Sequence, residues 1–164
     1  MGVKKLIALA GYAGAGKDEA AKPLIEAGFE RRCFGDSIKA QVDDLVKKHL
    51  GFSAFTEDRS LKPLIRRTLE SWGEDNYDNI FREFFANLPD RCVNTRLVRV
   101  KEAEEWVRQG GLIVEIRRPG VGPATKWERE QLVYLRMKRF VHTVVENDGT
   151  AADLHDKMRE LCGL

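Results

Sequence analysis

The chain has 164 residues, of which 28 are lysine or arginine and 26 are aspartate or glutamate. This length suits one domain with a sizeable core, and the near balance of charge gives no argument for a nucleic-acid polymer or a membrane surface as partner. Small-molecule substrates are therefore expected. Three cysteines without metal-ligand spacing favour free thiols in a reducing compartment. With no room for a signal peptide before the first strand and no bilayer-length apolar run, a cytoplasmic location is expected.

The most informative segment follows a short apolar run, Leu6 to Ala10, that is typical of a buried strand. Residues 11–18 read GYAGAGKD and match the phosphate-binding pattern of Gly, four residues, Gly and Lys. In that pattern backbone N–H groups surround phosphate oxygens while the lysine reaches the β and γ phosphates. The alternative is a glycine turn that merely reverses the chain. We expect ATP to bind at Gly11, Ala13, Gly14, Ala15, Gly16, Lys17, Asp18 and Glu19.

The last position of the pattern departs from the usual serine or threonine, because Asp18 stands there. A carboxylate beside a triphosphate is repelled unless a cation lies between them. Asp18 therefore indicates Mg²⁺ coordination, direct or through water, or a different mode of phosphate binding. Asp36, expected at the end of a second strand over 29–34, is a further candidate for orienting Mg²⁺ waters or the acceptor. Capping the next helix is its alternative role.

Three helices in a row are predicted next, over Ile38–Leu50, Leu61–Trp72 and Ile80–Leu88, from apolar residues at helical spacing. On the polar face of the second helix, Arg66 and Glu70 lie one turn apart. An arginine there can bind an acceptor phosphate, and a carboxylate can contact a sugar or base. An ordinary surface ion pair is the alternative.

Alternation of strands and helices resumes after residue 90, with strands expected over 91–97, 112–116 and 140–145, and helices over 102–109, from 127 to about 138, and from a Thr150–Asp153 capping pair. This pattern predicts a parallel sheet covered on both faces, with ligands at the carboxyl ends of its strands. Arg96, just after residues 91–93 of one such strand, would face the ligand crevice.

The segment RRPGVGPATK, residues 117–126, has two prolines and two glycines among cations and is expected to be an exposed, mobile loop. Arg117 and Arg118 begin it, and Arg129 and Arg136 follow it. Closure of such a loop would bring guanidinium groups over a transferring phosphate and exclude water. An ordinary solvated loop is the alternative.

Five segments in order, over nearly the whole chain, resemble the deoxynucleoside monophosphate kinases of tailed bacteriophages. They are GYAGAGKD at 11–18, FGDSIK at 34–39, RRTLESWGED at 66–75, EAEEWVRQGGLIVEIRRPG at 102–120 and NDGT at 147–150. The resemblance implies a single P-loop kinase domain of three layers, α/β/α, with a core of 1–36 and 90–164, a helical NMP-binding insert at about 37–89 and a lid at about 117–130. It also implies ATP, Mg²⁺ and a deoxynucleoside monophosphate acceptor, in a monomer or homodimer that supplies nucleotides in the host cytoplasm.

The resemblance carries over residue by residue. It covers the loop at 11–18, Asp36, Arg66 and Arg96. Taken together with the reasoning from the residues, the leading interpretation expects catalytic roles for Lys17, Arg66, Arg118, Arg129 and Arg136; acceptor binding by Asp36, Lys39, Arg66, Glu70, Trp72 and Arg96; and metal binding by Asp18 and Asp36. The family tends to have glutamine where Glu70 stands, and Asp-x-Arg where this chain has Asn94-Thr95-Arg96. These departures change hydrogen-bonding groups. They therefore leave open which base is accepted, but they do not change the expected reaction.

Two alternatives remain open at this stage. Another small-molecule kinase of the same architecture, such as a dephospho-coenzyme A kinase or an adenylate kinase-like enzyme, would differ only in its acceptor. A non-catalytic nucleotide-binding switch would find its sequence support in Asp18 and Asn94.

Overall fold

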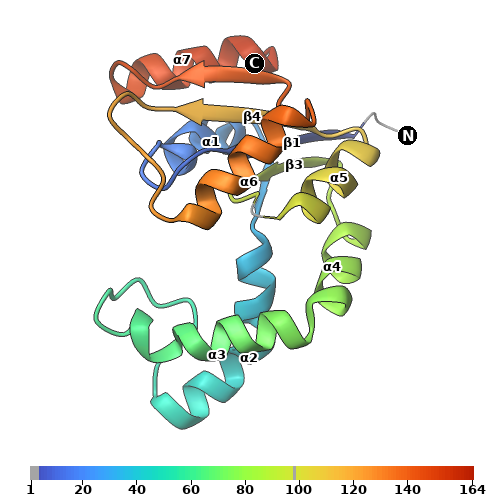
Figure 1. The fold of residues 1–164 in the computed structure, drawn as a ribbon. Helices are drawn as coiled ribbons and strands as arrows, with labels where there is room; N and C mark the ends of the chain where they lie inside the picture. Colours follow the sequence, from blue (N-terminus) through green and yellow to red (C-terminus); the bar gives the residue numbers. More distant parts are fainter. Residues whose placement is uncertain (1–3, 98) are drawn as a thin grey trace. The chain divides into compact units, whose positions relative to one another are not determined.

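The computed structural model describes residues 4–97 and 99–164 (Figure 1). The start of the chain, on which the expectation of no signal peptide depends, lies outside these residues. Two compact units are distinguished, one of the residues up to Arg32 together with Pro89–Leu164, and the other of Cys33–Leu88. Among the described helices, none combines the length and the apolar character that a membrane crossing requires.

The first unit is built on a parallel sheet of five strands in the order β2-β3-β1-β4-β5. The strands are β1 Lys5–Ala10, β2 Glu30–Arg32, β3 Arg91–Asn94, β4 Leu112–Arg117 and β5 Thr143–Glu146. The helices of this unit are α1 Lys17–Glu26, α5 Val100–Arg108, α6 Lys126–Met137 and α7 Ala151–Cys162. The predicted α/β class is confirmed. With β1 central, the loop that follows it opens at the carboxyl edge of the sheet, between the ends of β3 and β4.

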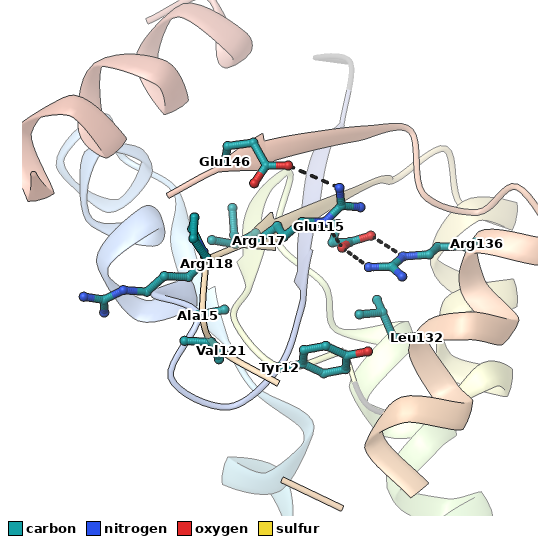
Figure 2. Close-up of a pocket in the computed structure, with 11 residues that line it drawn as sticks. Tyr12, Ala15, Glu115, Arg117, Arg118, Val121, Leu132, Arg136 and Glu146 are labelled. Carbon is teal, nitrogen blue, oxygen red and sulfur yellow. Dashed lines mark hydrogen bonds and ion pairs between the residues drawn. The ribbon is translucent and has the colours of Figure 1, made fainter. Parts of the chain in front are cut away.

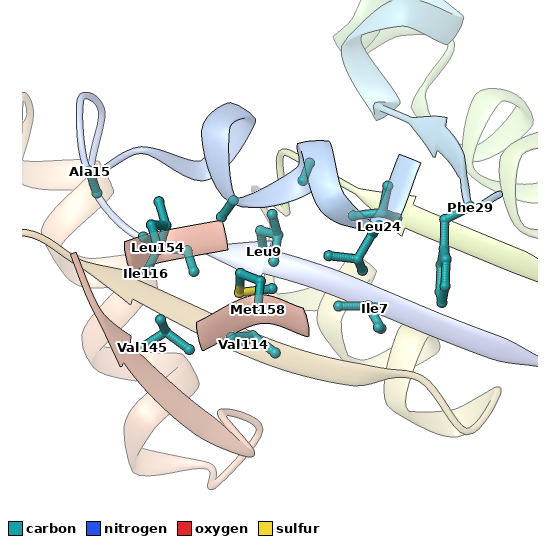
Figure 3. Close-up of a cluster of buried hydrophobic side chains, with 13 residues drawn as sticks. Ile7, Leu9, Ala15, Leu24, Phe29, Val114, Ile116, Val145, Leu154 and Met158 are labelled. Carbon is teal, nitrogen blue, oxygen red and sulfur yellow. The ribbon is translucent and has the colours of Figure 1, made fainter. Parts of the chain in front are cut away.

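Both faces of the sheet are covered, which explains why β1 is apolar throughout after Lys5. On one face, β1, β3, β4 and β5 pack against α1 and α7 (Figure 3). This cluster comprises Ile7, Leu9, Ala15, Ala20, Ala21, Leu24, Phe29, Val93, Val114, Ile116, Val145, Leu154 and Met158. On the other, the fully buried Trp106 of α5 donates from Nε1 to the carbonyl of Leu112 at 3.2 Å. The loops at the carboxyl edge of the sheet therefore start from buried strands.

Several boundaries differ from the predictions, among them the end of β3 at Asn94 rather than 97, and two of the differences follow from local contacts. The strand expected over 29–34 ends at Arg32, and α2 begins at Phe34, so Asp36 lies in the first turn of a helix instead of ending a strand or capping it. Cys33, in extended conformation, takes the capping position because it and Phe34 are buried. The last strand begins at Thr143 rather than 140, since the N–H of Phe140 still bonds the carbonyl of Leu135 and closes the end of α6.

The second unit is helical, with α2 Phe34–Leu50, α3 Lys62–Asp75 and α4 Tyr77–Ala86. Its core cluster is Val42, Val46, Ala54 and Ile65, with Phe52, Leu69 and Trp72 packed against it. Asp43 anchors the connection between α2 and α3. Its Oδ1 accepts from Ser53 Oγ at 2.7 Å and Ala54 N at 2.8 Å, and its Oδ2 lies 2.6 Å from Lys47 Nζ. These contacts, with the lysine the strongest, lower the pKa of Asp43 to about 2.

Candidate active site

The glycine-rich loop after β1 needs its glycines because neighbouring strands approach it closely. Gly11 has φ 135° and Gly16 has φ 100°, in the region that disfavours other residues. A Cβ on Gly11 would collide with the backbone carbonyl of Ile116 on β4. One on Gly16 would lie 2.5 Å from Nδ2 of Asn147, the side chain that donates to the carbonyl of Ala15 at 2.9 Å. The loop is therefore fixed against β4 and the segment after β5.

Lys17 opens α1, and its ammonium folds back onto the loop. Its Nζ donates to the carbonyls of Gly11 at 2.8 Å and Tyr12 at 2.9 Å. Burial lowers the pKa of Lys17, the negative charges of Glu128 and Asp18 oppose that shift, and the positive charge of Arg96 adds to it. Lys17 thus carries its charge inside the turn, within electrostatic reach of Arg96.

Glu128, in the first turn of α6, joins the phosphate loop to the segment preceding the helix. Its Oε1 accepts from the backbone N–H of Ala13 at 2.8 Å, and its Oε2 accepts from that of Ala124 at 2.7 Å. Thr125 caps the helix by accepting from the N–H of Glu128 at 3.1 Å. One carboxylate therefore ties the 118–125 loop to the turn that the sequence assigns to phosphate.

A cavity of about 350 Å³ adjoins the phosphate loop within the sheet unit (Figure 2). Its walls come from the loop, β4, the segment after β4, α6 and the end of β5. They comprise Tyr12, Ala15, Glu115, Ile116, Arg117, Arg118, Pro119, Val121, Leu132, Arg136 and Glu146. Aromatic and aliphatic groups line it together with three guanidinium groups and the carboxylates of Glu115 and Glu146, so the cavity offers a ligand apolar contacts beside a paired charge network.

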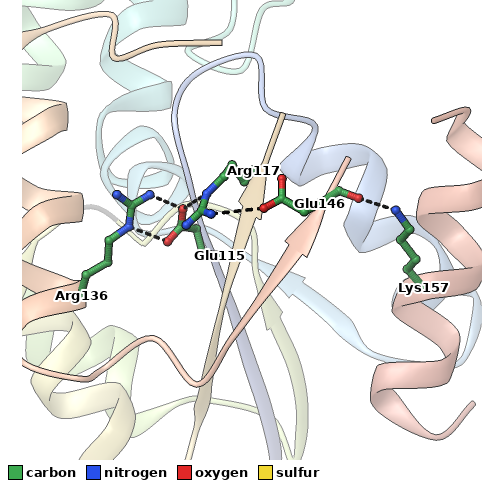
Figure 4. A network of polar contacts seen from close by, with 5 residues as sticks. All are labelled: Glu115, Arg117, Arg136, Glu146 and Lys157. Carbon is green, nitrogen blue, oxygen red and sulfur yellow. Dashed lines mark hydrogen bonds and ion pairs between the residues drawn. The ribbon is translucent and has the colours of Figure 1, made fainter. Parts of the chain in front are cut away.

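A charge network forms one wall of this cavity (Figure 4). Glu115 of β4 is 1% exposed and binds the guanidinium of Arg136 through both oxygens, with Nε to Oε2 at 2.8 Å and a short Nη2 to Oε1 contact. Arg117 donates to Glu115 at 3.2 Å and to Glu146 at 3.2 Å. Burial raises the pKa of Glu115, but the hydrogen bonds and charges of Arg136 and Arg117 outweigh it and leave that pKa below its ordinary value.

The predicted cations of the sheet unit lie in different surroundings. Arg136 is engaged by Glu115, and Figure 2 shows Arg117 reaching the same carboxylate while the Arg118 side chain points away from it. Arg129 is exposed on α6. Arg96 is exposed after β3, in a turn stabilised by the buried Asn94, whose Oδ1 accepts from the N–H of Arg96 at 3.0 Å.

Apart from Arg96, the predicted acceptor-binding residues lie on the helical unit. Arg66 and Glu70 are exposed on α3 and, among the residues described, form no ion pair with each other. Lys39 lies 3.3 Å from the carboxylate of Asp36. Trp72 packs against the core cluster of this unit and donates from Nε1 to Gln41 Oε1 at 2.8 Å. The surroundings of Trp72 are those of a partly buried packing residue.

Within 4–97 and 99–164, no group of three or more His, Cys, Asp or Glu side chains is gathered as a metal cluster. Asp18 presents an exposed carboxylate, 85% accessible and 3.9 Å from Arg31, next to the phosphate loop. Mg²⁺ at phosphate sites is commonly held by one or two carboxylates together with the substrate phosphates. The donor set at the loop fits that arrangement, with Asp18 as the candidate.

Sequence reasoning missed Glu115, Glu128 and Glu146. A glutamate inside the apolar run LIVEIR is a signal of a paired buried charge, and Thr125 three residues before Glu128 has the spacing of a helix cap. Neither pattern names the partners, which lie 21 and 115 residues away in the chain.

No known protein family matches the sequence, and no curated protein matches it either. Solved structures do match. A dephospho-CoA kinase from Campylobacter jejuni is 12% identical, with 97% of this chain and 96% of that chain covered and a TM-score of 0.52. A shikimate kinase from Bacteroides thetaiotaomicron is 12% identical, with 98% of this chain and 99% of that chain covered and a TM-score of 0.53. A gluconokinase from Sinorhizobium meliloti 1021 is 14% identical, with 99% of this chain and 94% of that chain covered and a TM-score of 0.50.

Identities this low show a shared fold alone. The chain has the α/β fold of these P-loop kinases, as predicted, and none of the three is a deoxynucleoside monophosphate kinase. Their names differ in the acceptor, so the fold leaves the acceptor open.

Proposed function

We propose that this protein is a kinase that transfers the γ-phosphoryl group of ATP to a deoxynucleoside monophosphate. The observation that carries the proposal is the glycine-rich loop at the carboxyl end of the central strand, with Lys17 inside it. Backbone N–H groups and an ammonium at the start of a helix form a site for the β and γ phosphates.

In this proposal the protein supplies positioning and positive charge, because phosphoryl transfer needs little covalent help. An oxygen of the acceptor phosphate bonds to the γ-phosphorus as its bond to the β,γ-bridging oxygen breaks, and ADP leaves. Asp18 would hold Mg²⁺, which when bound would neutralise charge on the phosphates. Arg96, Arg118 and Arg129 are exposed cations of the same unit that remain candidates for the transferring group.

In this proposal Arg136 is a cation held in a fixed position. Its Nε and Nη2 are held by the buried Glu115, so the guanidinium is fixed at the cavity wall. A fixed cation costs less reorganisation during reaction than a mobile one. The cavity beside the loop, lined by apolar groups, arginines and the carboxylates that pair with them, would then hold part of a nucleotide.

A deoxynucleotide acceptor is supported by the ordered sequence segments shared with the phage enzymes and by exposed Arg66 and Glu70 on the helical unit. A role in nucleotide supply in an infected cell rests on the resemblance alone. The second candidate is a dephospho-CoA kinase-like enzyme, which would share the fold and differ in its acceptor.

The deciding experiment is a coupled assay of ADP release with ATP and Mg²⁺, using each of the four common deoxynucleoside monophosphates and dephospho-CoA as acceptor. The proposal expects turnover with at least one deoxynucleotide. Turnover of dephospho-CoA alone would establish the second candidate.

The Arg66→Ala variant separates a kinase from a nucleotide-binding switch. A kinase should lose acceptor turnover and keep ATP affinity, and Arg67→Ala, at the next residue of α3 and also exposed, serves as control. Tight ATP binding without transfer to any acceptor, in the native protein and in the variant alike, would indicate the switch.

A further inference from the structure

We propose that Glu128 holds, in the nucleotide-free protein, the position that a phosphate oxygen of the nucleotide takes in the complex, so that nucleotide binding must displace it. The inference rests on the proposed function in that the incoming anion is the phosphate chain of ATP. It makes Glu128 the residue that sets nucleotide affinity and couples the 118–125 loop to the occupancy of the site.

The first support is the identity of the donor that Glu128 engages. The N–H of Ala13 belongs to the glycine-rich turn, and it donates to Oε1 of Glu128 at 2.8 Å. A carboxylate and a phosphate both offer anionic oxygens to backbone N–H groups, and such charge-assisted bonds are stronger than neutral ones. A phosphate oxygen seeking this donor therefore competes directly with the side chain of Glu128.

The second support is the state of Lys17. Its ammonium is bonded to the carbonyls of Gly11 and Tyr12, and the negative charge of Glu128 acts on it electrostatically. The turn thus has its N–H of Ala13 and its lysine satisfied from within the chain. A triphosphate arriving at the loop replaces an internal anion rather than filling an unpaired site.

The third support is the position of Glu128 between two segments. Its second oxygen accepts from the N–H of Ala124 at 2.7 Å, so displacement from Ala13 also loosens the end of the 118–125 loop. Further along α6, Arg136 stays bound to the buried Glu115. Displacement of the Glu128 carboxylate thus frees the loop at Ala124 while Thr125 still caps α6, which allows the loop to rearrange without unfolding the helix.

The test compares Glu128→Gln with Glu130→Gln. Glu130 lies on the same helix and, among the described residues, makes only an exposed ion pair with Lys126 at 3.6 Å, so it is a matched control. Glutamine has no charge, and an NH₂ donor replaces one of the two oxygens that accept separately from Ala13 and Ala124, so it cannot reproduce both contacts in the same geometry. Two readouts are used, the affinity for inorganic tripolyphosphate by calorimetry and backbone amide exchange of the segments containing Ala13 and Ala124 without ligand.

Loss of one hydrogen bond of ordinary strength corresponds to roughly a 2- to 10-fold change in an equilibrium. Glu128→Gln should therefore bind tripolyphosphate about 2- to 10-fold more tightly than the native protein, and both segments should exchange faster in the free variant. Glu130→Gln should match the native protein in both readouts. With saturating tripolyphosphate, the native protein and Glu128→Gln should show the same exchange in the 118–125 loop.

Glu128→Asp keeps the charge but shortens the reach by one methylene, so it should also exchange faster at Ala13. Equal tripolyphosphate affinity and equal exchange in the native protein and in Glu128→Gln would overturn the inference and leave the kinase proposal standing. If neither protein bound tripolyphosphate or ATP, the phosphate site itself would be refuted, and both proposals would fall.

Discussion

The buried Glu115–Arg136 pair offers the sharpest prediction about stability. Replacing Arg136 with methionine keeps much of the side-chain volume on α6 and removes the cation that binds both oxygens of Glu115. The carboxylate, 1% exposed, would then lack its main partner. The folded protein must then either keep a buried carboxylate charge with too few partners or take up a proton at Glu115.

Breaking a fully buried ion pair from one side costs about 3–5 kcal/mol. Here the value is reduced, because the Arg136 side chain is 39% exposed and Arg117 still lies 3.2 Å from Glu115. We expect Arg136→Met to lower the free energy of unfolding by about 2–3 kcal/mol, which for a chain of this length corresponds to a Tm lower by roughly 5–10 °C. Adding Glu115→Gln removes the stranded charge and should restore about half of that loss or more.

The pH dependence supplies an independent check. In the native protein the pKa of Glu115 is below its ordinary value, so its stabilising effect is complete above about pH 4.5 and is lost as pH falls through the lowered pKa. In Arg136→Met we expect burial to dominate and to raise the pKa of Glu115, so acidification protonates the carboxylate and removes the cost of its buried charge.

Urea unfolding of both proteins from pH 4 to 8 should therefore show a stability gap that narrows toward acid. A gap independent of pH, or a double variant no more stable than Arg136→Met, would refute this reasoning.

Three further predictions follow from other parts of the structure. Gly11→Ala places a Cβ against the Ile116 carbonyl at φ 135°, so we expect a loss of about 2–4 kcal/mol in urea unfolding and no measurable ATP binding; normal stability would contradict the geometry. Because burial lowers the pKa of Lys17, its ammonium should lose its charge below pH 10.5, the ordinary lysine pKa. ATP affinity measured by calorimetry should therefore decline with rising pH before that value is reached, while Lys17→Ala should bind ATP weakly at every pH. Asp43 has a pKa of about 2 against 3.8 unfolded, so its stabilisation of the helical unit is present above about pH 4 and fades toward pH 2; Asp43→Asn should make helix loss, followed by circular dichroism, less dependent on pH in that window.

Local patterns predicted the core of the fold well. The apolar run of β1, the glycine-rich turn and the start of α1 at Lys17 are adjacent in sequence, so each constrains the next. The Thr150–Asp153 capping box is confirmed for the same reason. The fold class followed from alternation of strands and helices alone.

The predictions from sequence failed where tertiary contacts determine the local structure. β2 consists of Glu30, Arg31 and Arg32, and its short charged sequence is a strand because it pairs with β3 at the edge of the sheet. Asp36 was misplaced because that strand was expected to be longer. The contacts of Glu115 and Glu128 depend on α6 returning to β4 and to the phosphate loop, which no local spacing encodes.

The most direct test of the central claim is ³¹P NMR of the protein with ATP, Mg²⁺ and each deoxynucleoside monophosphate in turn. The account predicts ADP and a deoxynucleoside diphosphate appearing in equal amounts for at least one base, and loss of both signals in Lys17→Ala. Unchanged ATP with all four acceptors, or equal product from Lys17→Ala, would contradict it.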